Sequence, residues 1–306
     1  MQRRGLNIRK ALLRIILPAV RKLPPKVASR FVAGIGRTEY AMGKTLRIRF
    51  DQAVSRGATY FGAPWDVRSV GRSLAGNQIR WRTRDQLLDG LTGDTVASLF
   101  EVAGHEHIDA AKAEGKGVIL LANHYGGHLM PAHWLVREGY PLRLFMEKPH
   151  HVSKMLAKEF ETDGPLGQKK LFISRKANPT EAAGSILRAG RVLKAGMVVM
   201  IASDVRWETG ITAEASFLGQ TYRFSATWVS LAALTGAPVV PVFCRMEADG
   251  AHHLEFLPSF HVPKDGGKPG RVAEFVQPCL TAIEERVRLH PENSNEYLFW
   301  DEPVRA

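Results

Sequence analysis

The fold of this 306-residue chain is most clearly indicated by the stretch Gly117-Val118-Ile119-Leu120-Leu121-Ala122-Asn123-His124-Tyr125-Gly126-Gly127-His128. A run of apolar residues leads directly into polar side chains and two glycines. A short run without polar alternation is typical of a strand that is buried on both faces of a parallel sheet. We therefore expect a strand over 117–122, and a helix after it through about 128–138.

Similar short apolar runs recur along the chain. Further strands are expected at 142–146, 170–173, 197–202 and 238–244, with an antiparallel edge strand at 253–257. Helical patterns separate them at 151–161, 180–195, 225–235 and 271–289. Buried strands that alternate with helices predict an α/β fold, a mixed but mostly parallel sheet flanked by helices. A basic helical segment precedes this domain.

The net charge of +12 has a definite location. The first 50 residues hold 13 Lys and Arg but one acid, Glu39, whereas the remaining residues hold 29 of each sign. A basic arm is attracted to anionic surfaces, which include phospholipid, nucleic acid and acidic carrier proteins. The arm lacks the exposed aromatic residues that stack on single strands, so nucleic acid is disfavoured.

The N-terminal arm is also amphipathic. Helical stretches are expected near 8–22, 24–35 and 40–55, and in the first of them leucines, isoleucines and Val20 cover one broad face between basic residues. This is the pattern of a helix that lies in a membrane interface, although a solvated helix packed on its own domain is the plainer alternative. We divide the chain into a membrane-association segment, 1–60, and an α/β domain, 61–306. With two cysteines, Cys244 and Cys279, a cytoplasmic setting is the default expectation.

The candidate site lies where the strands end. In parallel sheets ligands bind beyond the carboxyl ends of the strands, here 123–128, 147–151 and 203–208. His124 follows the first strand, and an ordinary imidazole pKa suits it to act as a general base near neutral pH. Gly126 and Gly127 let the backbone approach a ligand, and nearby amides are expected to hold an oxyanion. A histidine that only caps the turn is an equal alternative from spacing alone.

Rival chemistries are weaker. His124 and His128 are spaced for a zinc helix, but Gly126-Gly127 makes a continuous helix unlikely to form there, and no acid lies between them, so no metal site is predicted. Cys244 lies in an apolar strand, where a thiol is usually inert core. Asp204 follows the strand at 197–202 and is expected to face His124, with turn capping as its alternative role.

Several segments resemble the bacterial lipid A biosynthesis late acyltransferases, the lauroyl/myristoyl transferase family. These are 117–129, 173–176, 196–206, 217–241 and 289–300, in the family's order. The resemblance implies transfer of a fatty acyl group from a thioester, on acyl carrier protein or coenzyme A, to a hydroxyl or amine of a membrane lipid. It implies no cofactor, and a peripheral location at the cytoplasmic face of the inner membrane.

The chain departs from the family at one catalytic position. The family has a histidine followed by an acid after four residues; His124 matches the histidine, but the acid is replaced by Leu129. Three explanations stay open. Asp204, Glu147 or Glu208 supplies the acid, His128 takes part in proton transfer, or the protein is a catalytically silent relative that binds acyl lipids or acyl carriers.

The resemblance also implies substrate contacts. Arg175 matches a basic residue near the site and is expected to hold a phosphate arm or the acceptor. The segment 217–225, with Arg223, would border the acyl chain. Glu147 and the two glycines complete the expected substrate-binding set, beside the catalytic set His124, Asp204 and His128.

Overall fold

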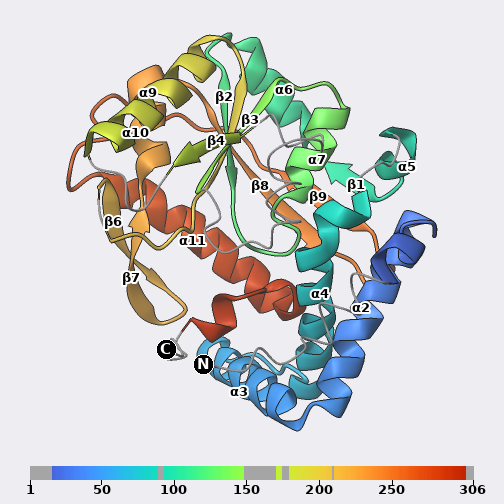
Figure 1. Ribbon diagram of the computed structural model, residues 1–306. Coiled ribbons are helices and arrows are strands. Elements are labelled where there is room, and N and C mark those ends of the chain that lie inside the picture. Colours follow the sequence, from blue (N-terminus) through green and yellow to red (C-terminus); the bar gives the residue numbers. More distant parts are fainter. Residues whose placement is uncertain (1–15, 89–92, 148–169, 174–178, 209, 301–306) are drawn as a thin grey trace, which may run out of the picture.

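A computed structural model describes residues 16–88, 93–147, 170–173, 179–208 and 210–300. Its centre is a seven-stranded sheet in the order β1-β9-β8-β2-β5-β3-β4 (Figure 1). The strands are β1 (Phe100–Ala103), β2 (Val118–Ala122), β3 (Leu142–Glu147), β4 (Lys170–Ile173), β5 (Val198–Ala202), β8 (Val239–Met246) and β9 (His252–Phe256).

The sheet is mixed and mostly parallel, as predicted. From β8 to β4 every neighbouring pair is parallel, and β9 is antiparallel to β8. The expected strand at 253–257 therefore exists, but it is not at the edge, because β1 pairs with its other side. This difference arises because the four-residue β1 was not predicted; its residues alternate between half-buried and exposed, so it lacks the apolar run of a central strand.

Helices cover both faces of the sheet. Strand residues such as Ile119 and Leu121 pack with α9 (Pro179–Lys194), α10 (Thr227–Thr235) and α11 (Val272–Leu289). Their neighbours Leu120 and Ala122 pack on the other face, with α5 (Gly93–Ala97), α6 (His105–Ala113) and α7 (Met130–Arg137). Because successive side chains of a strand point to opposite faces, each central strand contributes to both cores.

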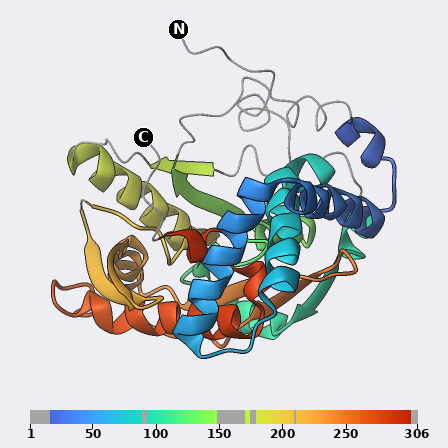
Figure 2. The same ribbon diagram turned by 90° about the horizontal axis from the view of Figure 1, so that it is seen from below.

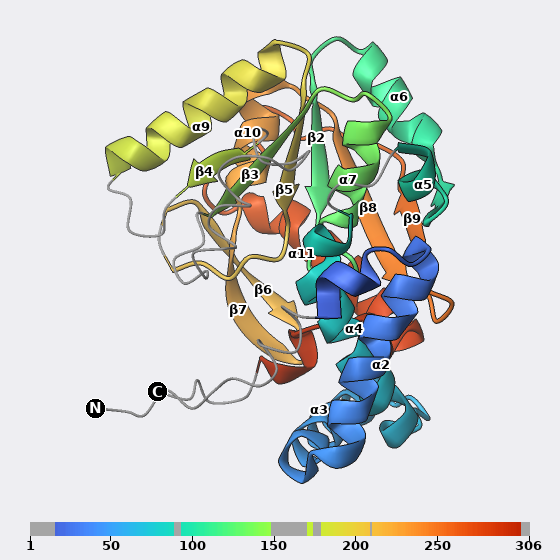
Figure 3. The same cartoon turned by 45° about the vertical axis from the view of Figure 1, so that its right-hand side comes forward.

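Three N-terminal helices form a group at the carboxyl edge of the central strands (Figure 3). They are α2 (Pro25–Met42), α3 (Lys44–Phe61) and α4 (Val67–Leu88), which lie together when seen from below (Figure 2). Gly36 lets α2 approach α4, since a Cβ there would lie 2.3 Å from the carbonyl oxygen of Ala75. The division predicted at residue 60 falls at the end of α3.

The N-terminal helices differ from the prediction in one respect that matters for function. Leu17 and Val20, assigned to a membrane-facing surface, are buried against Ala28, Val32 and Ile79. Their apolar face therefore packs on the protein, while residues 1–15 lie outside the described part. Among the described residues, no helix has the length and apolar character required to cross a bilayer.

Helices α4, α5 and α6 were not predicted, and neither were two further features. The residues just before α10, for which no strand was predicted, form an antiparallel hairpin, β6 (Thr212–Phe217) and β7 (Gln220–Ser225). After α11 the chain makes two 3₁₀ turns, η2 (Pro291–Asn293), which contacts α4 and α11, and η3 (Tyr297–Phe299), which contacts α3. The helix predicted at 151–161 lies outside the described residues.

Candidate active site

His124 and Asp204 meet at the carboxyl edge of neighbouring strands. His124 follows β2 and Asp204 follows β5, which pair in register from Val118 with Val198 to Ala122 with Ala202. Nδ1 of His124 lies 3.0 Å from Oδ1 of Asp204, and the main-chain N–H of His124 donates to Oδ2 at 2.8 Å. The carboxylate thus holds both the ring and the backbone of one residue, and Nε2 of His124 becomes the basic nitrogen.

Exposure and charge differ within this pair. The Asp204 side chain is fully buried, whereas that of His124 is 38% exposed. Burial lowers the pKa of His124, but the Asp204 charge and hydrogen bond outweigh it, so that the pKa of His124 is raised above 6.5. Burial raises the pKa of Asp204, but the attraction of His124 together with hydrogen bonds from His124 and Tyr297 holds that pKa below its ordinary value.

The turns after α11 hold the pair in place. The Tyr297 hydroxyl donates to Oδ2 of Asp204. Nδ2 of Asn295 donates to the carbonyl oxygens of His124 and Gly126, each at 2.6 Å. Asn295 has a left-handed backbone, with φ of 49°, a conformation that asparagine tolerates better than most residues. A segment 171 residues away in sequence therefore clamps the loop that carries His124.

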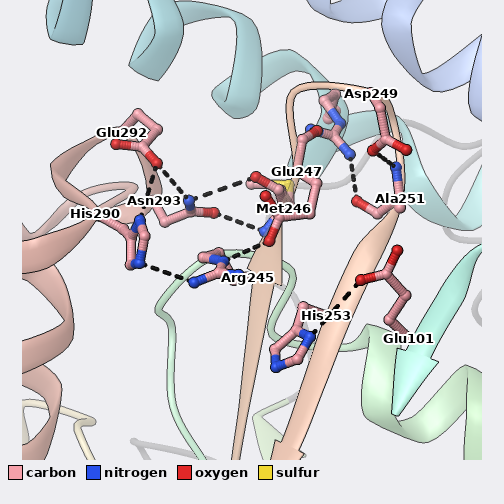
Figure 4. A network of polar contacts seen from close by, with 11 residues as sticks. Glu101, Arg245, Met246, Glu247, Asp249, Ala251, His253, His290, Glu292 and Asn293 are labelled. Carbon is pink, nitrogen blue, oxygen red and sulfur yellow. Dashed lines mark hydrogen bonds and ion pairs between the residues drawn. The ribbon is translucent and has the colours of Figure 1, made fainter.

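The clamp is itself anchored to the end of β8 (Figure 4). Oδ1 of Asn293 accepts the main-chain N–H of Met246 at 2.8 Å, and Nη1 of Arg245 lies 2.8 Å from Nε2 of His290. Arg245 also donates to Glu247 in the same view. This network joins the C-terminal turns to the strand beside β2, which restricts movement of Asn295 and Tyr297.

The ring of His128 lies against that of His124. The two rings stack, with centroids 4.7 Å apart and planes 29° from parallel. The indole N–H of Trp81, from α4, donates to Nδ1 of His128 at 2.7 Å. Nδ1 is therefore an acceptor, and a neutral His128 carries its proton on Nε2. In this arrangement His128 takes up a further proton only by giving up the Trp81 hydrogen bond.

The expectation for Gly126 and Gly127 needs correction. The amide of Gly126 donates to the carbonyl oxygen of Asn293, and that of Gly127 to the carbonyl oxygen of Cys244, both at 2.8 Å. These amides are engaged within the protein and do not face a reacting carbonyl. The glycines serve packing instead: Gly126 has φ of +54°, and a Cβ there would lie 2.0 Å from the Cys244 oxygen.

The other candidate acids are placed differently. Leu129 is buried in the core beside α7, so the position of the family acid is structural here. Glu208 is exposed beyond the β5 end. Glu147 ends β3, one strand beyond β5, and its side chain lies outside the described part. Asp204 is thus the acid that the structure brings to His124.

Of the two expected substrate arginines, the structure describes Arg223 alone. Arg175 lies outside the described residues. Arg223 is exposed on the hairpin, where its guanidinium donates to Glu214 on β6 at 3.0 Å. The aromatic residues of the same hairpin are largely core: the Phe217 ring packs edge-on against Tyr297, with centroids 5.2 Å apart.

An apolar pocket of about 360 Å³ lies between the sheet and α11. Asn123 and Ser203, which directly precede His124 and Asp204, form part of its wall. The rest is mainly apolar, with Leu121, Phe243, Phe260, Phe275, Cys279 and Ala282 among the lining residues. Two residues of the pocket wall are thus the sequence neighbours of the His–Asp pair. The pocket also has the apolar lining required to bind a hydrocarbon chain.

Sequence reasoning missed the residues that support the pair. Trp81, Asn293, Asn295 and Tyr297 come from segments with no strand-end or glycine-rich pattern. The run Asn293-Ser294-Asn295 offered one signal, because polar residues between a helix and an aromatic cluster are unusual and all three prove buried.

Comparisons with known proteins agree on one family. The model of the family described as bacterial lipid A biosynthesis acyltransferase matches residues 79–298, a span that holds Trp81, His124, Asp204 and Tyr297. A phosphatidylinositol mannoside acyltransferase of Mycobacterium tuberculosis is 28% identical over 193 residues, 62% of this chain and 56% of that protein. One from Mycolicibacterium smegmatis is 24% identical over 233 residues, 76% of this chain and 73% of that protein. The chain thus matches little more than half the length of the first of these relatives.

Proposed function

Because the chain belongs to the bacterial lipid A biosynthesis acyltransferase family, we propose that it transfers a fatty acyl group from a thioester to a hydroxyl or amine of a membrane lipid. The observation that carries the proposal is the His124–Asp204 pair. A half-exposed imidazole whose Nδ1 is held by a buried carboxylate is the arrangement of a general base.

In the proposed reaction Nε2 of His124 takes the proton of the acceptor as its oxygen or nitrogen attacks the thioester carbonyl carbon. Asp204 stabilises the imidazolium that forms. The tetrahedral intermediate then collapses, the carbon–sulfur bond breaks, and the leaving thiolate takes the proton from His124. These reaction steps require no covalent enzyme intermediate.

We assign two further parts to the site. The apolar pocket beside α11 takes the acyl chain, so that the thioester carbonyl lies near Asn123 and Ser203 in its wall. His128, held as the Nε2–H tautomer by Trp81, presents a hydrogen-bond donor and a flat ring beside His124. The donor is a carrier-protein or coenzyme A thioester, and the acceptor requires a location at the membrane surface, in our proposal the cytoplasmic face of the inner membrane.

The test is acyl transfer by a His124→Ala variant. Purified protein is given palmitoyl-coenzyme A, or palmitoyl carrier protein in a second arm, with a total polar lipid extract, and labelled lipid product is measured. We expect loss of at least about 10³-fold in transfer, because the general base is removed, with donor binding retained. His105→Ala is the matched control, since that histidine is 58% exposed on α6.

The alternative hypothesis, a catalytically silent relative that only binds acyl groups, predicts a different result. If wild-type protein binds the thioester but forms no lipid product in either arm, or if His124→Ala transfers at the wild-type rate, the proposal is wrong. Free fatty acid as the main product, formed with and without lipid, would indicate a hydrolase instead.

A further inference from the structure

An open groove of about 810 Å³ lies between α2, α3 and the first turns of α4. Four arginines line it, Arg37 from α2, Arg47 from α3, and Arg68 and Arg72 from α4. We call it the arginine groove. The carboxylate in its lining, Asp66, accepts the main-chain N–H groups of Arg68 and Ser69 and caps α4. The lining therefore carries three more positive than negative charges.

The arginines are oriented by the helices around them. Arg47 donates from Nη1 to the carbonyl oxygen of Ala41 at 2.9 Å, which fixes it over the end of α2. The buried ring of Tyr40 forms the floor, and its hydroxyl donates to Asp51. Asp51 is thus already bound to a partner within the protein. Cations from three helices converge on one concave surface, as in sites for phosphate groups.

Exposed apolar side chains adjoin the groove. Met42, the last residue of α2, is 82% exposed, and Ile48, in the second turn of α3, is 44% exposed. Lys44 is exposed between them. We call these three residues the α2–α3 corner. Side chains that alternate between apolar and basic in this way are typical of surfaces that enter the head-group region of a membrane.

The position of the groove relative to the active site is set by α4. Arg72 and Trp81 lie nine residues apart on this helix, which corresponds to about 13 Å at the rise of an α-helix. Trp81 in turn contacts His128 beside His124. A membrane bound at the groove would therefore lie close to the edge at which a lipid acceptor must reach His124.

We infer that the arginine groove and the α2–α3 corner form a docking surface for membranes that contain anionic phospholipid. The guanidinium groups bind head-group phosphates, and Met42 and Ile48 enter the boundary between head groups and acyl chains. An acidic carrier protein would also suit the charge, but it would not account for the exposed apolar corner. The membrane contact then lies on α2, α3 and the first turns of α4, because Leu17 and Val20 pack on the protein.

The test measures binding of the full chain to sedimented vesicles, without turnover. Vesicles of phosphatidylcholine alone are compared with vesicles that also contain phosphatidylglycerol. For Arg68→Gln/Arg72→Gln we expect roughly 30-fold weaker binding to the anionic vesicles, about 2 kcal/mol for two charges near the surface. For Met42→Ser/Ile48→Ser we expect weaker binding to both kinds of vesicle. Added salt should weaken wild-type binding to the anionic vesicles.

The matched control is Lys264→Gln/Lys268→Gln, which removes two exposed cations from the loop before α11 and should bind as wild type. Thermal unfolding checks that every variant is folded. Binding by the Arg68/Arg72 variant that equals the control, or equal binding of wild type to neutral and anionic vesicles, overturns the inference. So does normal vesicle binding by that variant combined with lost binding of acyl carrier protein.

This inference rests on the proposed function only for its biological purpose. His124→Ala should bind vesicles as wild type does, so a protein that docks but transfers nothing would refute the catalytic proposal alone. A protein that transfers to a detergent-dispersed lipid but ignores anionic vesicles would refute the docking surface alone.

Discussion

Nδ1 of His124 lies 3.0 Å from Oδ1 of Asp204, although the two residues are 80 positions apart in sequence. The parallel pairing of β2 with β5 brings them together, because both follow the last paired residues of their strands. The family has an acid five positions after the histidine, and in this chain that position holds the buried Leu129. An acid from the adjacent strand end occupies the place where such a partner is needed.

The first prediction concerns the protonation of His124. Its pKa should lie above the ordinary 6.5 in the wild type, because the charge and the hydrogen bond of Asp204 together outweigh the effect of burial. In Asp204→Asn the attraction is lost and burial remains, so the pKa of His124 should fall below the wild-type value. Titration of the ring proton resonances by NMR, assigned with His124→Ala, measures both. An unchanged pKa in Asp204→Asn would contradict the pairing.

The second prediction concerns Tyr297. Tyr297→Phe removes a hydrogen bond to the buried Asp204 carboxylate. A hydrogen bond to a charged group contributes about 1.5–3 kcal/mol, so we expect a comparable loss in the free energy of unfolding and a lower kcat with little change in KM. Tyr140→Phe is the control, since its hydroxyl donates to Asp109 at an exposed site. Equal effects of the two substitutions would show that Tyr297 has no special role in positioning Asp204.

The third prediction concerns Gly126. Gly126→Ala should destabilise the fold by more than about 2 kcal/mol, because it adds a left-handed backbone penalty and a clash with the Cys244 oxygen. Gly139 has φ of +81° and open space around its missing Cβ, so Gly139→Ala carries the backbone penalty alone. Urea unfolding compares them. If both variants lose the same stability, the close approach of Gly126 to β8 does not matter.

The fourth prediction concerns the pocket beside α11. Ala282→Phe places a large side chain in its lining and should shift the preferred donor towards shorter acyl chains. Competition between lauroyl and palmitoyl thioesters measures the shift. Glu285→Phe, on the exposed side of the same helix, should leave the preference unchanged. A chain-length preference that Ala282→Phe leaves unaltered would place the acyl chain elsewhere.

The centre of the sheet was predictable because its middle strands are buried on both faces. β2 and β5 consist of apolar residues alone, and β8 begins with an apolar run, so a sequence pattern reveals them directly. β1 and the hairpin β6–β7 lack such runs, because burial alternates along β1 and β6 and is only partial along β7. Helix α4 was also not predicted, because arginines recur along its length and interrupt its apolar pattern.

The site was predictable as far as strand ends determine it. His124 and Asp204 each follow a recognisable buried strand, so their meeting follows from the sheet. The contributions of Trp81, Asn295 and Tyr297 depend on long-range packing of α4 and of the turns after α11, which no local spacing encodes. The amides of Gly126 and Gly127 donate to Asn293 and Cys244, which are remote in sequence, so the oxyanion contact expected near these glycines does not come from those two amides.

The central claim is that Asp204 replaces the acid missing at Leu129, and the rate of acyl transfer by Asp204→Asn tests it most directly. The asparagine preserves size and one hydrogen bond but removes the charge that orients His124 and stabilises its imidazolium. Loss of the corresponding aspartate charge in a serine protease lowers kcat by about 10⁴-fold. We predict a fall in kcat of at least about 10³-fold with donor binding unchanged. A variant that transfers acyl groups at a rate near that of the wild type would contradict the account.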